Sequence, residues 1–213
     1  MDSLRITEIF YSLQGEANTA GIPTVFIRLT GCPLRCTYCD TAYAFHGGHK
    51  MTLQAILDDV HHYSCRYVTV TGGEPLAQAN CPRLLDRLIA ENFIVSLETS
   101  GALDISKVDS RVIKVMDLKT PSSGEESKNN FANIDHLQAH DQVKFVIGDA
   151  TDYEWSKALI RHHALHERCD ILFSPVMNQQ NPTELAEKIL QDRLPVRFQI
   201  QLHKLLWGDA QGK

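Results

Sequence analysis

Three cysteines lie close together in the run Gly31-Cys32-Pro33-Leu34-Arg35-Cys36-Thr37-Tyr38-Cys39. Because three and then two residues separate them, one tight loop can present all three thiolates. Such a set can ligate three irons of a 4Fe-4S cubane and leave the fourth iron open to an external ligand. With His46 or His49 it can instead complete a zinc knuckle. The spacing alone leaves both kinds of metal site open.

A glycine pair marks a second candidate site. The run Thr71-Gly72-Gly73-Glu74-Pro75 directly follows an apolar stretch over 67–70 that predicts a strand. The motif therefore lies at the carboxyl end of a strand, where ligands bind in parallel α/β folds. Glycines let the backbone approach a ligand closely, and Glu74 can accept from an ammonium group. An isolated glycine pair would be an ordinary turn, but beside the cysteine run it favours a ligand site.

The elements that must position these residues alternate along the chain. Short runs rich in Val, Ile and Phe predict strands over 24–29, 67–70, 94–97, 112–116, 142–147, 171–173 and 197–202. Between them, apolar residues at helical spacing predict a helix capped by Thr52 and another after Pro82. A capping box of Thr151 and Glu154 predicts a third helix through Arg161. The pair Asn181-Pro182 opens a fourth through Leu190.

Alternation of this kind indicates parallel strands joined by right-handed crossovers. The 213 residues have room for about six strand-helix units, fewer than the eight of a closed barrel of roughly 250 residues. We therefore expect an α/β fold, a partial and open parallel barrel with about six core strands. Residues 117–133 are rich in Pro, Ser, Gly and Asn, and we predict a loop there.

Composition indicates one domain over residues 1–213, since 43% of the residues are hydrophobic and 22% are charged. The net charge of -5 argues against direct nucleic-acid binding. The first residues show no charged leader followed by an apolar stretch, and no run of 18 apolar residues occurs, so we expect a cytoplasmic protein that does not bind membranes. Six cysteines without a regular framework favour reduced thiols and a metal over disulfides.

The cysteine run and the glycine motif together resemble the radical S-adenosylmethionine (SAM) superfamily, whose members combine CxxxCxxC with a GGEP-like sequence. The resemblance implies that Cys32, Cys36 and Cys39 hold a 4Fe-4S cluster. It also implies that the amino and carboxylate groups of SAM chelate the free iron. One electron then cleaves the sulfonium, and a 5'-deoxyadenosyl radical removes a hydrogen atom from substrate.

A closer resemblance extends over nearly the whole chain. It is carried by Arg28 and by the runs Leu13-Gln14-Gly15-Glu16, Cys39-Asp40-Thr41, Asp117-Leu118-Lys119-Thr120-Pro121-Ser122-Ser123-Gly124 and Gln201-Leu202-His203-Lys204. These resemble the 7-carboxy-7-deazaguanine synthase family of carbon-nitrogen lyases in queuosine biosynthesis. The family converts 6-carboxy-5,6,7,8-tetrahydropterin into 7-carboxy-7-deazaguanine with loss of ammonia. The resemblance implies Mg²⁺, a flavodoxin-like reductant and a homodimer.

The same resemblance implies roles for individual residues. A short N-terminal segment would bind the pterin, and the substrate contacts would be Leu13, Gln14, Gly15, Arg28 and Thr71. Thr41 would be the Mg²⁺ ligand, and Glu16 would close the same wall. The SAM contacts would be Gly73, Glu74, Glu98, Ser100, Asp117, Leu118 and Lys119. Many relatives have Ser-Pro-Lys where this chain has Asp117-Leu118-Lys119, so backbone contacts are expected there rather than defined side-chain roles.

Two alternatives stay open at this point. An activase of a glycyl-radical enzyme would share the CxxxCxxC loop, although Leu13-Gln14-Gly15-Glu16 and Cys39-Asp40-Thr41 argue against it. A zinc-stabilised binding module would need no catalysis at all. The C-terminal tail offers His203, which either approaches the site or is a packed or surface histidine, and Trp207 as an anchor of the tail or a subunit contact. No general acid or base is evident in the sequence.

Overall fold

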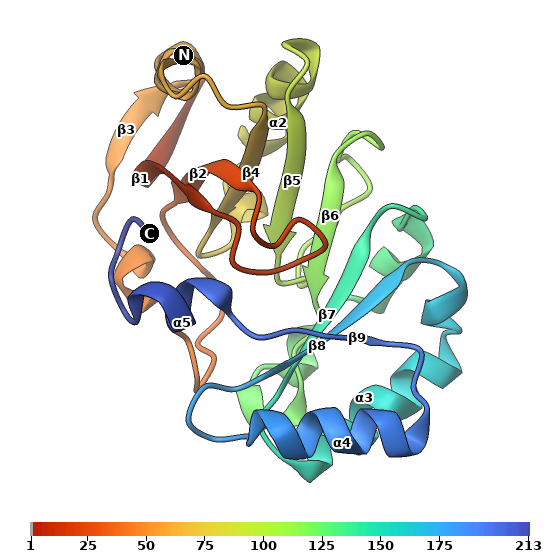
Figure 1. Ribbon diagram of the computed structural model, residues 1–213. Coiled ribbons are helices and arrows are strands. Elements are labelled where there is room, and N and C mark those ends of the chain that lie inside the picture. The colour runs from red at the N-terminus through yellow and green to blue at the C-terminus, as the bar shows by residue number, and fades with distance from the viewer. Residues whose placement is uncertain (1) are drawn as a thin grey trace.

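The computed structural model describes residues 2–213, which form one curved, open sheet with helices packed along it (Figure 1). Nine strands in this part of the chain pair in the order β3-β1-β2-β4-β5-β6-β7-β8-β9. Their bounds are β1 Ser3–Leu13, β2 Pro23–Leu29, β3 His49–Thr52, β4 Tyr67–Gly72, β5 Ile94–Thr99, β6 Ile113–Asp117, β7 Gln142–Ile147, β8 Asp170–Pro175 and β9 Arg197–Phe198. β3 and β9 are opposite edges of the described sheet, so it does not close.

The parallel part of the sheet confirms the expected partial barrel. β2, β4, β5, β6, β7 and β8 pair in parallel in that order, and the short β9 adds to β8. Six full strands match the number expected from the chain length. Because all of them run the same way, their carboxyl ends meet at one edge, where the loops that follow them can build a shared site.

Two strands, β1 and β3, were not predicted from the sequence. β1 pairs antiparallel with both β2 and β3. The pairing register of β1 shifts between Ile6 and Glu8, where a bulge interrupts the ladder. A bulge breaks the two-residue alternation by which a half-buried strand is recognised, so the pattern in this stretch was hidden.

The four predicted helices are present, as α1 Leu53–His62, α2 Cys81–Ala90, α3 Ala150–His162 and α4 Pro182–Asp192. Thr52 and Asn181 cap α1 and α4 through their side chains, as expected. The predicted capping box of α3 is wrong. Asp149 caps this helix instead, because its carboxylate accepts from the backbone N–H of Asp152, and Thr151 already lies inside the first turn.

The C-terminal region also differs from expectation. The strand predicted over 197–202 ends after two residues, since β9 covers only Arg197–Phe198. A further helix, α5 Leu202–Trp207, begins where the strand was expected to end. Two short 3-10 turns, Pro121–Ser123 and Glu126–Lys128, lie within the loop predicted over 117–133, and a third, Phe131–His136, begins in it and ends three residues beyond it.

The connection between β1 and β2, residues 14–22, crosses the opening of the partial barrel toward β6 (Figure 1). The backbone N–H of Asn18 donates to Gln142 Oε1 at 2.8 Å, and its side-chain amide donates to Asp170 Oδ2 at 2.6 Å. Ala17 is buried in the same connection. We call residues 14–22 the crossing loop, since it joins the first strand pair to the far strands of the sheet.

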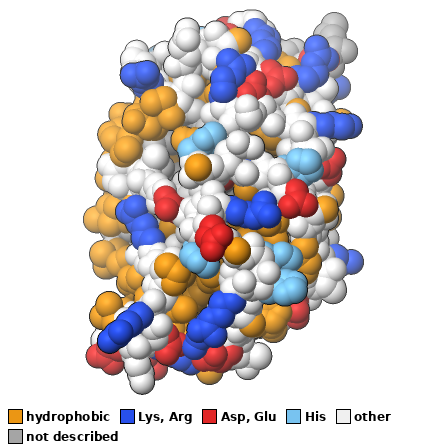
Figure 2. All heavy atoms as spheres, turned by 90° about the vertical axis from the view of Figure 1, so that its right-hand side faces the viewer, with side chains coloured by type: hydrophobic (Ala, Val, Ile, Leu, Met, Phe, Trp, Pro, Cys, Tyr) orange, Lys and Arg blue, Asp and Glu red, His pale blue; other side chains and the backbone are white. Residues whose placement is uncertain are grey.

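The core lies between the sheet and the outer helices. The apolar faces of α1 and α2 are buried there, as their spacing predicted. On the face seen in Figure 2, basic, acidic and histidine side chains are interspersed with one another and with apolar ones. Among residues 2–213, no helix combines the length and the apolar character that crossing a bilayer requires.

Candidate active site

A cavity of about 370 Å³ lies at the carboxyl ends of the strands, and it brings the predicted residues together. Of the expected site residues, those that line it are Leu13, Gln14, Gly15, Arg28, Cys32, Cys36, Cys39, Thr41, Thr71, Gly73, Glu98, Ser100, Asp117 and Lys119. Glu74 and Leu118 are not among its lining residues, and both are fully buried. One cavity therefore joins the cysteine run, the glycine motif and the N-terminal segment.

The cysteine loop, residues 31–39, lies against the glycine motif. The backbone N–H of Glu74 donates to Gly31 O at 2.8 Å. A Cβ added at Gly73 would stand 2.2 Å from Gly31 O and 2.8 Å from Cys32 Cβ, so only glycine allows this approach. The two motifs are adjacent in space as well as joined in the resemblance.

The three thiols fit the chemistry of a 4Fe-4S cluster. Cys32, Cys36 and Cys39 are unpaired, partly buried and directed to the same cavity. Burial is the main factor that raises the pKa of the Cys32 and Cys36 thiols. Within the described residues, no group of three His, Cys, Asp or Glu side chains is arranged to hold a single metal ion. Neither His46 nor His49, the histidines of the zinc alternative, lines the cavity.

Glu74 supports the cavity wall from behind. Its carboxylate accepts from Ser100 N at 2.7 Å, Ser100 Oγ at 2.6 Å, Thr99 Oγ1 at 2.9 Å and Leu76 N at 3.0 Å. These bonds use both carboxylate oxygens, as a buried carboxylate requires. The structure therefore does not bring this carboxylate to the position expected for a SAM contact. It instead fixes Ser100, which does line the cavity.

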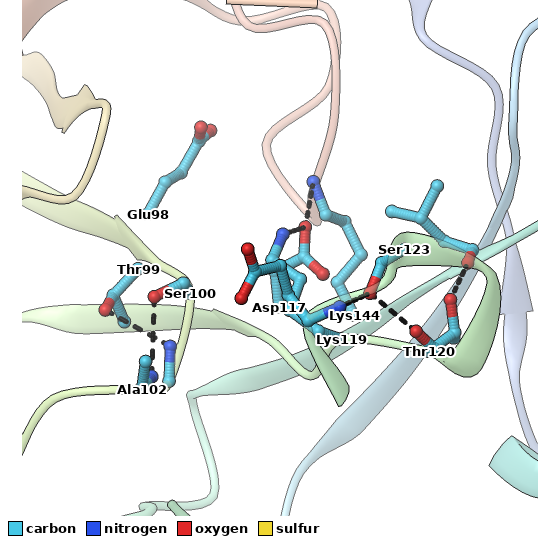
Figure 3. Close-up of polar contacts among 12 residues, drawn as sticks. Glu98, Thr99, Ser100, Ala102, Asp117, Lys119, Thr120, Ser123 and Lys144 are labelled. Atoms are coloured by element: carbon cyan, nitrogen blue, oxygen red, sulfur yellow. Dashed lines mark hydrogen bonds and ion pairs between the residues drawn. The ribbon is translucent and has the colours of Figure 1, made fainter. Parts of the chain in front are cut away.

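A set of charged side chains forms another wall of the cavity. Lys144 Nζ lies 2.7 Å from Glu16 Oε2 and 3.5 Å from Asp117 Oδ2, and Lys119 Nζ lies 3.1 Å from Asp117 Oδ2. Figure 3 shows Asp117, Lys119 and Lys144 together, with Glu98 projecting from the neighbouring strand. We call Glu16, Glu98, Asp117, Lys119 and Lys144 the charged wall.

Glu16 and Lys144 stabilise each other's charge despite burial. Burial alone would raise the pKa of Glu16, but Lys144 and the hydrogen bond from Gln201 hold it below its usual value. Burial would likewise lower the pKa of Lys144, but Glu16 and then Asp117 hold it well above its usual value. Asp117 Oδ1 is buried and has no hydrogen-bond partner among the described residues. That oxygen can accept from a ligand in the cavity.

Glu98 behaves differently from its charged neighbours. Burial, followed by the negative charge of Glu16, raises its carboxyl pKa. Thr71 Oγ1 donates to Glu98 Oε2 at 3.0 Å, and Gln14 Nε2 lies 3.3 Å from Oε1. Glu98 is thus grouped with two expected substrate contacts, and a raised pKa favours its protonated form.

Arg28 and Thr41 lie on the side of the cavity nearest β1. Arg28 Nε donates to Glu8 Oε1 at 2.7 Å, and its guanidinium lies 5.8 Å from the centre of the Tyr43 ring. Thr41 Oγ1 donates to Asp40 Oδ1 at 2.8 Å. A hydroxyl next to a carboxylate at a cavity surface is a donor set that suits Mg²⁺, which binds oxygen ligands and retains waters.

The C-terminal segment completes the cavity. Gln201 Nε2 donates to Glu16 Oε1 at 2.8 Å and to Asp40 Oδ2 at 3.1 Å. His203 lies so close to Gly15 that a Cβ there would stand 2.0 Å from its Nδ1. The sequence left open whether His203 approaches the site, and in the structure His203 lines the cavity.

Three contributors were not assigned roles from the sequence: Glu8, Lys144 and Gln201. Lys144 had a usable signal, because a lysine inside the apolar strand 142–147 must either reach solvent or find a charged partner. Glu8 had none, since its strand was not recognised. Gln201 stood in a run that carried the resemblance, but nothing in its spacing indicated contact with both Glu16 and Asp40.

Comparison with known proteins agrees with the resemblance found in the sequence. Residues 26–187 match the radical SAM superfamily. The 7-carboxy-7-deazaguanine synthase of Chlorobaculum tepidum is 45% identical and the match covers 98% of this chain and 97% of that protein. The synthase of Koribacter versatilis is 39% identical, with 96% and 97% covered. QueE from Escherichia coli has a similar fold, with a TM-score of 0.75 at 22% identity over 94% of this chain and 95% of that one.

These matches set aside both the zinc-stabilised module and the glycyl-radical activase. The relatives are matched over almost their full length, and the superfamily match includes the cysteine loop and the glycine motif. The chain belongs to the radical SAM superfamily and, within it, to the 7-carboxy-7-deazaguanine synthase family.

Proposed function

We propose that this enzyme converts 6-carboxy-5,6,7,8-tetrahydropterin into 7-carboxy-7-deazaguanine with release of ammonia. The observation that carries the proposal is the single cavity that unites the three cysteines with Gln14, Arg28 and Thr41. The names of the relatives support the same reaction. When bound, the cluster and SAM supply the one-electron chemistry that begins hydrogen abstraction from the pterin.

Cys32, Cys36 and Cys39 would hold the cluster, and SAM would lie against Gly73 and Ser100. Gly73 lines the cavity, and its lack of a side chain lets it lie directly against the cysteine loop. Ser100 is held in place by Glu74. Asp117 Oδ1 would accept from an amino or hydroxyl group of the cofactor, since it lacks a partner within the described residues.

The pterin would occupy the side of the cavity formed by Leu13, Gln14, Gly15, Arg28 and Thr71. A guanidinium can bind a substrate carboxylate, so Arg28 is suited to the carboxyl group at position 6. Glu98 contacts Gln14 and Thr71, so it would bind the substrate rather than SAM. A protonated Glu98 would donate to an acceptor atom of the pterin.

Mg²⁺ would bind at Thr41, with Asp40 beside it. There the ion would orient the charged substrate and stabilise negative charge that develops during the rearrangement. Gln201 holds Asp40 from the other side, so the C-terminal segment would help position the site.

The remaining proposals concern partners and location. A flavodoxin-like reductant would supply the electron, and the protein would act in the cytoplasm without binding nucleic acid or membrane. We propose a homodimer, supported by the exposure of Leu205 and Leu206 on α5, at 69% and 50%. Analytical ultracentrifugation tests this, and a species of monomer mass across concentrations would contradict it.

The reaction is tested with anaerobically reconstituted, reduced protein supplied with SAM, Mg²⁺ and the carboxytetrahydropterin. We expect the deazaguanine chromophore, ammonia and 5'-deoxyadenosine. A curated relative, such as the Chlorobaculum tepidum protein, is the parallel control. The substrate assignment is wrong if the control forms product while this protein cleaves SAM and leaves the pterin unchanged.

A further inference from the structure

We propose that Asp152 is a positioning residue for the iron-sulfur cluster, which it reaches through residues 120–125, here called the support segment. This inference rests on the proposed cluster-binding role of the cysteine loop. Neither Asp152 nor any residue of the support segment lines the cavity. Asp152 is nonetheless completely buried, and its carboxylate lies two hydrogen-bonded steps from the cysteine loop.

The support segment holds the middle of the cysteine loop. The Thr37 backbone N–H donates to Ser123 O at 3.0 Å, and Thr37 Oγ1 donates to Ser122 O at 2.8 Å. The Arg35 backbone N–H donates to Glu125 Oε1 at 2.7 Å. Arg35 and Thr37 flank Cys36 on both sides, so these three bonds fix the backbone that carries this thiol.

Asp152 in turn holds the support segment. Its Oδ1 accepts from the Ser122 backbone N–H at 2.9 Å, and its Oδ2 accepts from Ser122 Oγ. The same Oδ2 accepts from the Gly148 backbone N–H at 2.8 Å. Burying a carboxylate costs free energy unless it is hydrogen-bonded, so Asp152 needs these donors in order to remain buried. One side chain thereby ties the end of β7 to the support segment.

Glycine is needed where these elements meet. A Cβ at Gly148 would stand 2.6 Å from Ser122 Oγ and 3.2 Å from Asp152 Oδ2. Gly124 has φ of 74°, the left-handed conformation that ends the short turn Pro121–Ser123. Figure 3 shows that turn closed by Ser123, whose hydroxyl donates to Thr120 O. The contact geometry leaves little freedom for the segment to shift.

Asp152 is not required to cap α3. Asp149 performs that function, because its Oδ1 accepts from the Asp152 backbone N–H at 2.9 Å. The two aspartates lie at the start of the same helix, but only Asp152 contacts the support segment. They therefore provide a matched pair, in which one substitution weakens the helix start and the other also releases the support segment.

Removing the Asp152 contacts should loosen the loop around Cys36 and weaken retention of the cluster. In Asp152→Asn, one acceptor becomes an amide donor that faces either Ser122 or the Gly148 N–H. Outer contacts of this kind typically change metal retention by about 10-fold or more. Thr37→Val removes the hydrogen bond from the exposed Thr37 hydroxyl to Ser122 O in the support segment. Thr37→Ser retains that hydroxyl.

The experiment compares Asp152→Asn, Thr37→Val, Thr37→Ser and Asp149→Ala after identical anaerobic reconstitution. The readouts are iron and sulfide per chain, the rate of iron loss to a chelator, the EPR spectrum of the reduced cluster, and the melting temperature of the apo chain. We expect iron loss about 10-fold faster in Asp152→Asn and several-fold faster in Thr37→Val. Thr37→Ser and Asp149→Ala should retain iron as the parent does, although Asp149→Ala should melt lower because it loses the side-chain cap.

Parental iron loss and EPR spectra in both Asp152→Asn and Thr37→Val would overturn the inference. Equal iron loss in Asp149→Ala and Asp152→Asn would also overturn it, because a weakened helix start would then explain both. If Asp152→Asn does not fold, Thr37→Val decides, since Thr37 is exposed. A parent protein that binds no cluster would refute the proposed function itself, which is a different result from a parent and variants that retain it equally.

Discussion

The cysteine loop and the charged wall face the same cavity but are built in different ways. The loop is held mainly through backbone groups, such as the bond from Thr37 N–H to Ser123 O, and its thiols are left without strong partners. The charged wall is already paired, with Lys144 between Glu16 and Asp117. One region keeps its ligands available for iron, and the other arranges its charges before substrate arrives, which limits reorganisation on binding.

The largest effect is expected from breaking the cysteine loop alone. Cys36→Ala removes one of three cluster ligands and should abolish 5'-deoxyadenosine formation, because the cluster then loses an iron ligand. The charged wall is untouched, so binding of the pterin to the apo protein should persist in calorimetry. Cys65→Ala is the control, since Cys65 lies outside the cavity. Continued deoxyadenosine formation by Cys36→Ala would remove the loop from the mechanism.

Breaking the charged wall should give the opposite pattern. Lys144→Met leaves Glu16 and Asp117 without their shared cation, and breaking a buried pair in this way costs about 3 kcal/mol or more of unfolding free energy. Iron content should stay at the parental level while pterin binding is lost. Lys157→Met, which breaks a peripheral pair with Asp192, should change stability far less. Iron loss equal to the loss of pterin binding would show that the two regions are not separable.

The sequence predicted these two regions unequally. The cysteine loop and the glycine motif are local patterns, so each could be recognised directly in the sequence. The charged wall could not be assembled in this way, because Glu16 and Lys144 are far apart in sequence and meet only when the crossing loop spans the open barrel. The position of Glu74 could not be predicted for a related reason, because its burial behind Ser100 depends on side-chain packing that a sequence motif does not show.

The fold itself was predictable where the pattern was regular. The parallel strands and four helices follow from apolar spacing, whereas β1 was hidden by its bulge at Ile6 and Glu8. The strand expected over 197–202 gave way to α5 after Phe198, a tertiary outcome that β-rich composition does not reveal. This change of direction after β9 matters for function, since it brings Gln201 and His203 to the cavity.

A smaller effect is expected from releasing the crossing loop. Asn18→Ala removes the side-chain bond to Asp170 and the one from Arg197, at a cost of about 1 kcal/mol for an ordinary hydrogen bond. Gln14, Gly15 and Glu16 lie just before Asn18 in the crossing loop. Releasing the loop should therefore raise KM for the pterin several-fold, while SAM cleavage without substrate stays unchanged. An unchanged KM together with slower SAM cleavage would mean that the crossing loop serves the cysteine loop instead.

The smallest effect separates Glu98 from the rest of the charged wall. Its pKa is raised, first by burial and then by Glu16, so its protonated form stabilises the fold at low pH and this contribution is lost as pH rises through the raised pKa. Arg28 and Lys144 also face it and oppose the shift without reversing it. Glu98→Gln keeps the shape of the side chain but cannot ionise. As pH rises, the unfolding free energy of the variant should therefore increase relative to that of the parent. Denaturant titrations of both apo proteins below and above the ordinary glutamate pKa measure this difference. Parallel curves would show that Glu98 ionises normally, and Glu98 would then be a carboxylate of the same kind as Glu16 rather than a neutral group beside it.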